Sequence, residues 1–292
     1  MRVGLIGLGV MGWRIGVNLK NAGKLDVVYN RTQSKAEEFS RKFGVMKASS
    51  VQDLSKEVDL ILLMLSDDQA VRDTVNLLLE NVKGKTVVDM STISPSLSVE
   101  LAKEVEKRGG TMYDAPVVGT SIMVEQKRLN VLVGGPEHGF QEIKSLLLNT
   151  ASTVLYMGRN GMGLYAKLVN NLLIGAYVAS MAEAFNLGVR SGLDPKQVSE
   201  FLAKYSSARS PTSELKADMM ATRDYSTQFA TKHMRKDLEI IEREAQKLGV
   251  INPMSSLALQ LYRMAEAMGL SEKDYASVLE IYSMSSRGKV DS

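Results

Sequence analysis

The sequence predicts an α/β N-terminal domain and an all-α C-terminal domain joined by one long helix. Through the first half of the chain, short β-branched runs alternate with amphipathic helical stretches, which implies βαβ units and a largely parallel sheet. A proline-free helical pattern then extends from Met162 to about Arg190, enough for a helix roughly 40 Å long. Beyond this helix, the remaining pattern is helical only.

The expected strands are rich in β-branched or continuous apolar residues, and the expected helices carry apolar residues at helical spacing. Strands are expected at Val3–Ile6, Leu25–Tyr29, Val58–Met64, Thr86–Met90, Thr111–Tyr113, Val131–Val133 and Thr153–Tyr156. Helices are expected at Val10–Asn21, Gln33–Lys42, Gln69–Glu80, Pro95–Arg108 and Glu137–Leu148. Strands that are apolar throughout, rather than at alternate positions, fit a sheet covered on both faces.

Helix-start signals mark the all-α region. Asp194-Pro195 and Asn252-Pro253 each combine an N-cap residue with proline at the first helical position. The run from Ser271 to Asp274 is a capping-box pattern. We therefore expect residues 1–160 to form the α/β domain and residues 161–292 to form the all-α domain, which begins with the long helix.

Composition excludes several classes of function. A chain of 292 residues with 45% hydrophobic and 24% charged residues is ordinary for a globular protein. The net charge of +3 is too small to indicate binding to nucleic acid or to a membrane surface. No cysteine and only two histidines are present, so we expect no metal site. Mean hydropathy of -0.07 predicts no transmembrane segment, and the glycine run after Ile6 argues against a signal peptide; we expect a cytoplasmic protein.

A glycine-rich motif joins the first expected strand to the first expected helix. Gly7, Gly9 and Gly12 follow the GxGxxG pattern directly after that strand. Such glycines permit a tight turn and a close approach of the backbone to a pyrophosphate at the helix N-terminus. In this context the motif predicts dinucleotide binding rather than a merely flexible turn. The expected cofactor-binding residues of the motif are Gly7, Leu8, Gly9, Val10, Met11 and Gly12.

The end of the second expected strand indicates which dinucleotide is bound. An NAD site usually carries Asp or Glu about 20 residues beyond the glycine loop. Here Tyr29 is followed by Asn30, Arg31 and Thr32, with no acid. Arg31 can form charge-assisted hydrogen bonds to a 2′-phosphate, and Asn30 and Thr32 can add neutral ones. We therefore expect NADP rather than NAD, the alternative being that Arg31 is a solvated surface charge.

A lysine and an asparagine share one face of the long helix. Gly158, Gly161 and Gly163 lead into it, and Lys167 and Asn171 follow four residues apart, so their side chains project from the same face. A lysine that is partly removed from water has a lowered pKa and can act as a general acid or base. A single helical lysine is usually solvated, but the glycine-rich approach and the apolar neighbours favour a functional site.

Several segments, in this order, resemble the β-hydroxyacid dehydrogenase family. They are Gly7–Gly12, Met90–Pro95, Asp114–Val117, Gly158–Asn171 and Lys236–Leu238. The resemblance spans nearly the whole chain. It implies a Rossmann-type domain, an all-α domain that packs against a partner subunit, and an active site between the two domains.

The resemblance also implies roles for individual residues. Lys167 corresponds to the catalytic acid/base, and Asn171 corresponds to a residue that binds the substrate. Lys236 corresponds to a residue at the nicotinamide end of the cofactor, beside the substrate. Further cofactor contacts are implied for Leu65, Ser66, Ser91 and Thr92.

Two positions depart from the family pattern. Members commonly continue Asp-Ala-Pro-Val with Ser-Gly-Gly, whose hydroxyl and backbone amides hold the substrate carboxylate. Here the run is Val118-Gly119-Thr120-Ser121, so Val118 removes that hydroxyl, and Thr120 and Ser121 are the candidates to replace it. We include all four as substrate-binding residues. Pro211 stands where some members place a substrate-facing tryptophan.

These observations predict an NADP-dependent oxidoreductase that transfers a hydride between the cofactor and a short β-hydroxy acid, L-serine or 3-hydroxyisobutyrate, or the corresponding semialdehyde. A semialdehyde or glyoxylate reductase of the same family is one alternative. The other is a non-catalytic NADP-binding interaction protein, against which the presence of both Lys167 and Asn171 argues. The family resemblance and the apolar segments 168–185 and 254–270 predict a homodimer or homotetramer.

Overall fold

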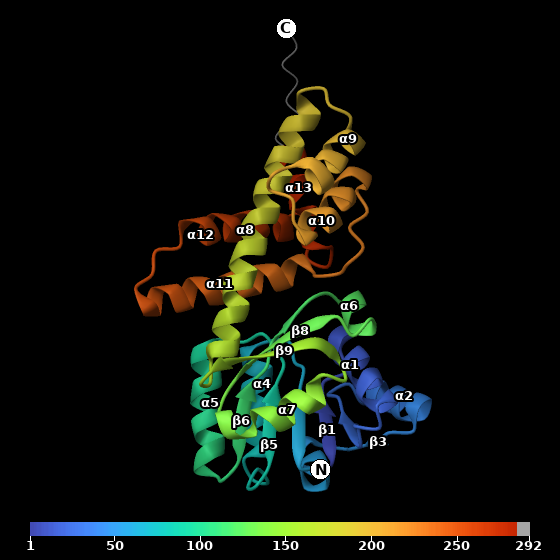
Figure 1. Cartoon of the computed structure of the whole chain (residues 1–292), viewed down its shortest axis with the longest axis vertical. Helices are drawn as coiled ribbons and strands as arrows, with labels where there is room; N and C mark the ends of the chain where they lie inside the picture. Colours follow the sequence, from blue (N-terminus) through green and yellow to red (C-terminus); the bar gives the residue numbers. More distant parts are fainter. Residues whose placement is uncertain (285–292) are drawn as a thin grey trace. The chain divides into compact units, whose positions relative to one another are not determined.

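The computed structural model describes residues 1–284 and divides into two compact units. The first unit is Met1–Lys167, and the second begins at Leu168. Helix α8 (Met162–Arg190) contains the point in the chain where one unit ends and the other begins, and it has the bounds that the sequence predicts (Figure 1). The predicted combination of an α/β N-terminal part and a helical C-terminal part is confirmed.

The first unit contains a nine-stranded sheet with the order β3-β2-β1-β4-β5-β6-β8-β7, and β9 pairs with β8. Its strands are β1 (Val3–Ile6), β2 (Val27–Tyr29), β3 (Met46–Lys47), β4 (Leu60–Leu63), β5 (Thr86–Asp89), β6 (Thr111–Asp114), β7 (Val117–Val118), β8 (Leu129–Gly134) and β9 (Ala151–Gly158). The strands from β1 to β6 are parallel, whereas β8 is antiparallel to β6 and β7. The chain runs outward from β1 to β2 and then returns to β4 on the other side. This switch point is where open α/β sheets bind ligands.

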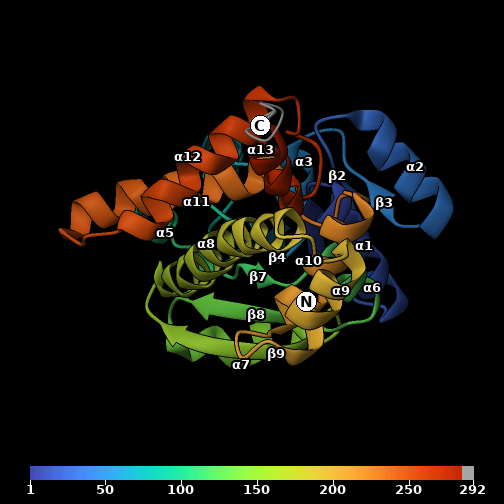
Figure 2. The same ribbon diagram turned by 90° about the horizontal axis from the view of Figure 1, so that it is seen from above.

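Helices cover both faces of this sheet, as the continuous apolar strands predict. Leu60 and Leu62 of β4 belong to one cluster of buried side chains, and Ile61 and Leu63 belong to another. The helices are α1 (Val10–Asn21), α2 (Gln33–Phe43), α3 (Val51–Glu57), α4 (Asp68–Leu78), α5 (Pro95–Lys107), α6 (Ser121–Glu125), the 3-10 helix η1 (Glu137–Gly139) and α7 (Phe140–Leu147). Helix α7 lies against β9 (Figures 1 and 2).

The second unit is helical in the part of the chain that the structure describes. After α8 come α9 (Pro195–Glu200), the π-helix η2 (Phe201–Tyr205), α10 (Pro211–Thr222), α11 (Thr231–Leu248), α12 (Pro253–Ala267), the 3-10 helix η3 (Tyr275–Val278) and α13 (Leu279–Met284). Helices α11 and α12 lie side by side, and α11 ends at Gly249 in the left-handed conformation (Figure 2).

The helix-start predictions have different outcomes. Asp194 caps α9 by accepting hydrogen bonds from the next turn, and Pro195 is its first residue. Helix α12 also begins at Pro253, although the Asn252 side chain caps no amide. The capping box predicted at Ser271 is wrong, because η3 begins later and Asp274 is its cap. That cap is fixed by tertiary contacts that the local pattern does not contain.

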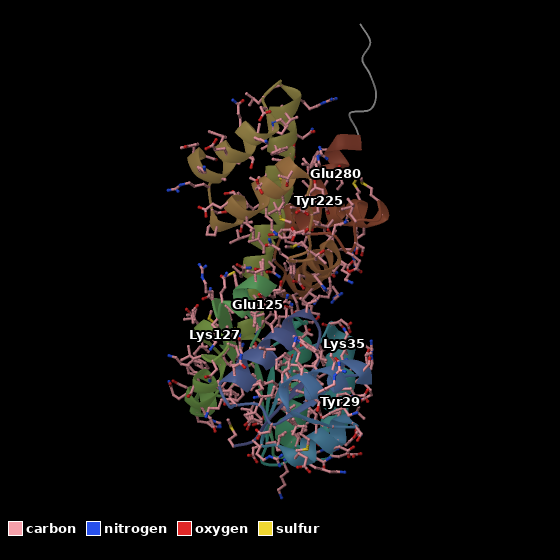
Figure 3. The ribbon with its side chains drawn as sticks, turned by 90° about the vertical axis from the view of Figure 1, so that its right-hand side faces the viewer. Tyr29, Lys35, Glu125, Lys127, Tyr225 and Glu280 are labelled. Atoms are coloured by element: carbon pink, nitrogen blue, oxygen red, sulfur yellow. The ribbon has the colours of Figure 1, made fainter. Side chains whose placement is uncertain are left out.

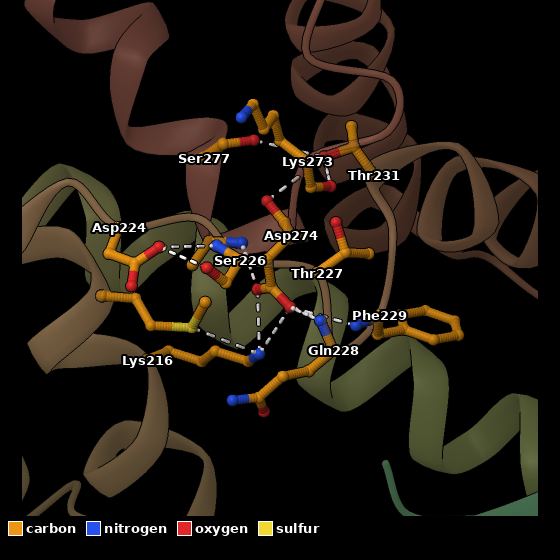
Figure 4. Close-up of polar contacts among 12 residues, drawn as sticks. Lys216, Asp224, Ser226, Thr227, Gln228, Phe229, Thr231, Lys273, Asp274 and Ser277 are labelled. Carbon is orange, nitrogen blue, oxygen red and sulfur yellow. Dashed lines mark hydrogen bonds and ion pairs between the residues drawn. The ribbon is translucent and has the colours of Figure 1, made fainter. Parts of the chain in front are cut away.

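A buried ion pair connects three segments of the second unit. Lys216 Nζ of α10 lies 2.8 Å from Asp274 Oδ1 and 2.9 Å from Oδ2, and both side chains are buried (Figure 4). The same carboxylate accepts hydrogen bonds from the backbone N–H groups of Gln228 and Phe229, in the loop before α11. Asp274 therefore joins α10, this loop and η3.

The loop before α11 also contacts helix α13. Arg223, the C-cap of α10, has φ +57 and forms an ion pair with Glu280 of α13. Tyr225 Oη donates a hydrogen bond to Glu280 Oε1 over 2.6 Å (Figure 3). These contacts fix the start of α11, which carries Lys236 and Asp237.

Helix α8 is more apolar than the mean hydropathy of the whole chain. Within residues 1–284, it is long and apolar enough, by length and composition, to cross a membrane, with an 18-residue window of mean hydropathy 1.5. The chain average hides this segment because the charged helices around it offset its apolar residues. Val169, Leu173 and Leu187 of α8 are exposed, at 63%, 63% and 71%. The helix thus presents apolar side chains outside the core of the unit.

Candidate active site

The glycine loop between β1 and α1 is shaped by close backbone packing. Gly7 has φ +102, and a Cβ atom there would lie 2.3 Å from the carbonyl oxygen of Met64. A Cβ atom at Gly12 would lie 2.0 Å from the carbonyl oxygen of Gly7, whereas one at Gly9 would meet nothing within 4 Å. The first and third glycines are therefore required by the fold, while the second borders open space. A pyrophosphate can approach the backbone at that second position.

The N-terminus of α1 suits an anion. Gly9 is its N-cap, no side chain caps its first turn, and that turn holds no acidic residue. Its leading N–H groups have no partner within the helix, and the helix dipole places positive charge there. Val10, at 66% exposure, and the half-buried Met11 begin the helix. The loop and helix together fit the pyrophosphate of a dinucleotide.

Asn30 connects the glycine loop to the end of β2. Its Oδ1 accepts a hydrogen bond from Leu8 N over 2.8 Å, and its Nδ2 donates to the carbonyl oxygen of Thr32 over 3.0 Å. Arg31 and Thr32 follow at the surface, and among residues 1–284 no carboxylate pairs with Arg31. Lys35, exposed in the first turn of α2, adds a second positive charge (Figure 3). Lys35 was not among the residues expected from the sequence, although its place one turn after Arg31 was a signal that could have indicated it.

A second group of predicted cofactor residues lies at the ends of β4 and β5. Ser91 Oγ accepts a hydrogen bond from Leu65 N over 2.8 Å, and Ser91 N donates to Asp89 Oδ1 over 2.9 Å. Leu65 and Thr92 are half-buried, and Ser66 is exposed. Since β1, β4 and β5 are adjacent parallel strands, these residues share one edge of the sheet with the glycine loop.

The predicted substrate loop follows β7. Val118 is half-buried, and Gly119 has φ +140, where a Cβ atom would lie 2.6 Å from Leu129 Cδ2. Only glycine fits this backbone conformation and this space. Thr120 is the N-cap of α6, but its hydroxyl group caps no amide of that helix, and Ser121 is buried. The backbone of the loop is thus fixed, with two hydroxyl groups at its end.

Lys167 lies in the second turn of α8 and is only 6% exposed. The first turn of that helix is held by Asp114, whose carboxylate accepts hydrogen bonds from Gly161 N and Leu164 N over 2.6 and 2.9 Å. A lysine so removed from water, on a helix whose start is fixed, has surroundings unlike those of a solvated surface lysine and is a candidate functional residue.

Asn171 and Lys236 meet around one carboxylate in the second unit. Asn171 Nδ2 donates a hydrogen bond to Asp237 Oδ2, and Asn171 Oδ1 accepts one from Asn170 Nδ2 over 2.9 Å. Lys236 Nζ lies 3.2 Å from Asp237 Oδ1, and Asp237 is 1% exposed. Asp237 lies within the segment Lys236–Leu238, but no role for it was expected from the sequence. Its position beside Lys236 was the only signal in the sequence.

Two family models together match most of the chain. Residues 2–158 match the model described as the NAD binding domain of 6-phosphogluconate dehydrogenase. Residues 161–282 match the model described as NAD-binding of NADP-dependent 3-hydroxyisobutyrate dehydrogenase. The chain belongs to the β-hydroxyacid dehydrogenase family. The resemblance stated from the sequence is therefore confirmed, and α8 belongs to the second matched region.

Relatives of this chain include named dehydrogenases and reductases. It is 37% identical to the mitochondrial 3-hydroxyisobutyrate dehydrogenase of Rattus norvegicus, over 95% of this chain and 86% of that protein. It is 30% identical to the chloroplastic glyoxylate/succinic semialdehyde reductase 2 of Arabidopsis thaliana, over 95% of this chain and 78% of that protein. The structure of Mycobacterium tuberculosis 3-hydroxyisobutyrate dehydrogenase with L-serine has the same fold, with a TM-score of 0.88, 24% identity, and coverage of 96% of this chain and 99% of that one.

Membership of the family indicates the general class of this chain. Its relatives are NAD(P)-linked oxidoreductases of small hydroxy acids or their aldehydes. Among residues 1–284, no group of histidine, aspartate and glutamate side chains could hold a metal ion.

Proposed function

We propose that this protein is an NADP-dependent dehydrogenase of a short β-hydroxy acid, L-serine or 3-hydroxyisobutyrate, with Lys167 as its acid/base. The observation that carries the proposal is the pairing of Lys167 and Asn171 on α8. They lie four residues apart on one face of the helix, and both are buried. A buried amine beside a buried, hydrogen-bonded amide is costly to maintain for packing alone, but it is useful for moving a proton.

The cofactor residues we propose are those at the carboxyl edge of the sheet in the first unit. The open space at Gly9 and the uncapped start of α1 support a pyrophosphate site. Arg31 and Lys35, with no acid between them, support a 2′-phosphate and hence NADP. We propose that Asn30 holds the glycine loop and that Thr32 can donate a hydrogen bond. When bound, the nicotinamide supplies the hydride chemistry.

The protein groups supply proton transfer and orientation. In oxidation, Lys167 accepts the proton of the substrate hydroxyl group, and in reduction it returns that proton. Asn171, held by Asp237, orients the hydroxyl oxygen, and Lys236 contributes positive charge. The substrate carboxylate is held by the backbone amides of Gly119 and Thr120 and by the Ser121 hydroxyl group, because Val118 offers none.

The chemistry of these segments favours a compact substrate. No arginine lies in the loop 118–121 or within residues 161–171. A phosphorylated sugar acid would need such a group to pair with its phosphate. We therefore propose a three- or four-carbon acid rather than a larger phosphorylated one. As the division into domains, we propose residues 1–160 and residues 161–292.

One alternative is a semialdehyde or glyoxylate reductase, and the 30% identity to the Arabidopsis enzyme favours it. It would use the same residues with the proton moving in the opposite direction. A non-catalytic NADP-binding protein is less well supported, since Asp237 holds Asn171 and Lys236 in fixed positions that binding of a nucleotide alone does not need.

We also propose that the protein is a cytoplasmic homodimer or homotetramer. The exposed apolar residues of α8 are matched on α12 by Met254, Leu257 and Met264, which are 58%, 59% and 50% exposed. Apolar residues repeated along a helix face at this exposure usually mark an interface. Light scattering of the purified protein should give at least twice the monomer mass, and a monomer at micromolar concentration would contradict this proposal.

The proposed function is tested by following NADPH formation with a panel of hydroxy acids. L-serine, 3-hydroxyisobutyrate and 6-phosphogluconate should each be offered with NADP and with NAD, and succinic semialdehyde and glyoxylate should be offered with NADPH. We expect higher kcat/KM with NADP and with a small acid. Higher kcat/KM for 6-phosphogluconate, or equal kcat/KM with both cofactors, would contradict the substrate or the cofactor assignment respectively.

A further inference from the structure

Asp114 is a buried acid for which the proposed chemistry has no use. It ends β6, and its side chain has 0% exposure. Its Oδ1 accepts a hydrogen bond from Gly161 N over 2.6 Å, and its Oδ2 accepts one from Leu164 N over 2.9 Å. These two donors lie 47 and 50 residues later in the chain, at the start of α8. A strand residue therefore caps a helix that is remote from it in sequence.

The space for this carboxylate is provided by two glycines. A Cβ atom at Gly134 would lie 2.7 Å from both carboxylate oxygens of Asp114. A Cβ atom at Gly163 would lie 2.8 Å from Asp114 Oδ2 and 2.3 Å from the carbonyl oxygen of Leu132. Any larger residue at either position would displace the carboxylate or the helix. Strand β8, the carboxylate and the first turn of α8 thus pack as closely as backbone allows.

Burial and backbone hydrogen bonds act in opposite directions on the Asp114 carboxyl group. Burial raises the pKa of Asp114, and hydrogen bonds from the N–H groups of Gly161, Leu164 and Gly163 oppose that rise. The positive end of the α8 dipole acts in the same direction as these donors. Asp89, the register partner of Asp114 on β5, is also buried, and its Oδ1 accepts a hydrogen bond from Ser91 N. Each carboxylate oxygen of Asp114 accepts a hydrogen bond from a backbone N–H group at the start of α8.

We propose that Asp114 is a positioning residue for Lys167. Its carboxylate fixes the first turn of α8, and Lys167 follows Leu164 by three residues, so it projects from the next turn. A change in the position of the first turn would move the lysine amine relative to the reacting atoms. Misplacement of a catalytic group by about 1 Å can lower a rate roughly 100-fold. This inference rests on the proposed role of Lys167 as the acid/base.

A cap that served stability alone would behave differently. Its loss would lower the unfolding temperature but would leave turnover unchanged in protein that remained folded. Loss of a positioning cap lowers kcat while the KM for the hydroxy acid and the Kd for NADP stay near their original values. The comparison of kcat with KM, at a temperature well below unfolding, therefore separates the two roles.

The test variant is Asp114→Asn in the full chain. One amide oxygen still accepts a hydrogen bond, but the amide nitrogen faces an N–H donor and repels it. We expect kcat to fall about 10- to 100-fold, with KM and NADP Kd within about twofold of the wild-type values. Asp114→Ser, which is smaller and cannot clash, should behave in the same way if the asparagine variant does not fold.

Asp194→Asn is the matched control. Asp194 caps α9 by accepting hydrogen bonds from Lys196 N and Gln197 N, and α9 carries no proposed site residue. This variant should keep the wild-type kcat. Unchanged kcat in a folded Asp114 variant, or an equal loss in Asp194→Asn, would overturn the positioning role alone. A wild-type protein without activity on any hydroxy acid or semialdehyde would overturn the proposed function, and this inference with it.

Discussion

The Nδ2 atom of Asn171 donates a hydrogen bond to Oδ2 of Asp237 over 2.5 Å, and both side chains are almost completely buried. The other oxygen of the same carboxylate lies 3.2 Å from Lys236 Nζ. One acidic residue on α11 therefore orients two polar side chains, Asn171 of α8 and Lys236 of its own helix. Because the amide of Asn171 is fixed at both ends, its oxygen and nitrogen cannot exchange places.

Replacement of this carboxylate should weaken substrate binding. In Asp237→Asn, one oxygen becomes an N–H donor, so Asn171 and Lys236 cannot both keep their partner. A hydrogen bond to a charged group contributes about 1.5–3 kcal/mol, so we expect KM for the hydroxy acid to rise by roughly 10- to 150-fold. Steady-state kinetics would measure this rise. Glu239→Gln, which changes another α11 acid to its amide, is the control, and equal KM values in the two variants would contradict the role of Asp237.

The choice of cofactor should depend on Arg31. Arg31→Ala removes the exposed guanidinium group beside the predicted 2′-phosphate position, and NADP binding should weaken by about 1.5–3 kcal/mol. NAD binding should change little, because NAD has no 2′-phosphate. Titration calorimetry with both nucleotides would measure the two effects. Arg41→Ala, near the C-terminal end of α2, is the control. An equal loss of NADP and NAD affinity in Arg31→Ala would show that Arg31 does not bind the 2′-phosphate.

Long patterned elements could be predicted from the sequence, and short or tertiary features could not. Helix α8 has the bounds that its proline-free pattern predicts, and α1 begins and ends as expected. Strands β3 and β7 have two residues each, too few for any periodicity, and α3 and α6 are also short. These four elements were missed. A run of two residues becomes a strand only because a neighbouring strand pairs with it.

In the candidate site, too, local patterns could be predicted from the sequence, and contacts between distant residues could not. The GxGxxG loop and the Lys167–Asn171 spacing are local patterns, so the sequence contains them. The Asp237 contact with Asn171 joins residues 66 apart, and the Asp114 contact with Leu164 joins residues 50 apart. No spacing rule predicts such pairs in one sequence. The capping-box prediction at Ser271 failed for a related reason, since a buried ion pair of Asp274 sets the start of η3.

Loss of one partner of the Lys216–Asp274 ion pair should destabilise the second unit. In Lys216→Met, Asp274 keeps its backbone N–H donors but loses its counter-charge in a buried site. Removal of one partner of a buried pair costs about 3–5 kcal/mol, so the free energy of unfolding should fall by that amount. Urea unfolding would measure the loss. Lys204→Met removes an exposed partner of Glu200 and should leave stability nearly unchanged; similar losses in both variants would contradict this prediction.

Stability should depend on pH through His233. Burial lowers the pKa of His233, and the charge of Lys236 lowers it further, whereas Asp237 and Glu272 oppose this shift. The unfolded chain titrates near 6.5, so below that pH it binds a proton that the folded chain resists. The stabilising contribution is therefore present above about pH 6.5 and is lost as the pH falls toward the folded-state pKa.

His233→Gln should remove this dependence, because glutamine does not titrate. Between about pH 7.5 and pH 5, the unfolding temperature of the wild-type protein should fall more than that of the variant. His138→Gln, at an exposed position, is the control. Curves that stay parallel for the wild-type protein and His233→Gln would show that His233 does not contribute.

Turnover of Lys167→Ala tests the proposed chemistry most directly. The variant and the wild-type protein should be assayed for NADPH formation with the best small hydroxy acid, and their NADP affinity should be measured by titration. Loss of the proton acceptor should lower kcat by about 10²–10⁴-fold, with NADP affinity nearly unchanged. Lys103→Ala, an exposed lysine of α5, should retain full turnover. Near-native kcat in Lys167→Ala would contradict the assignment of Lys167 as the acid/base.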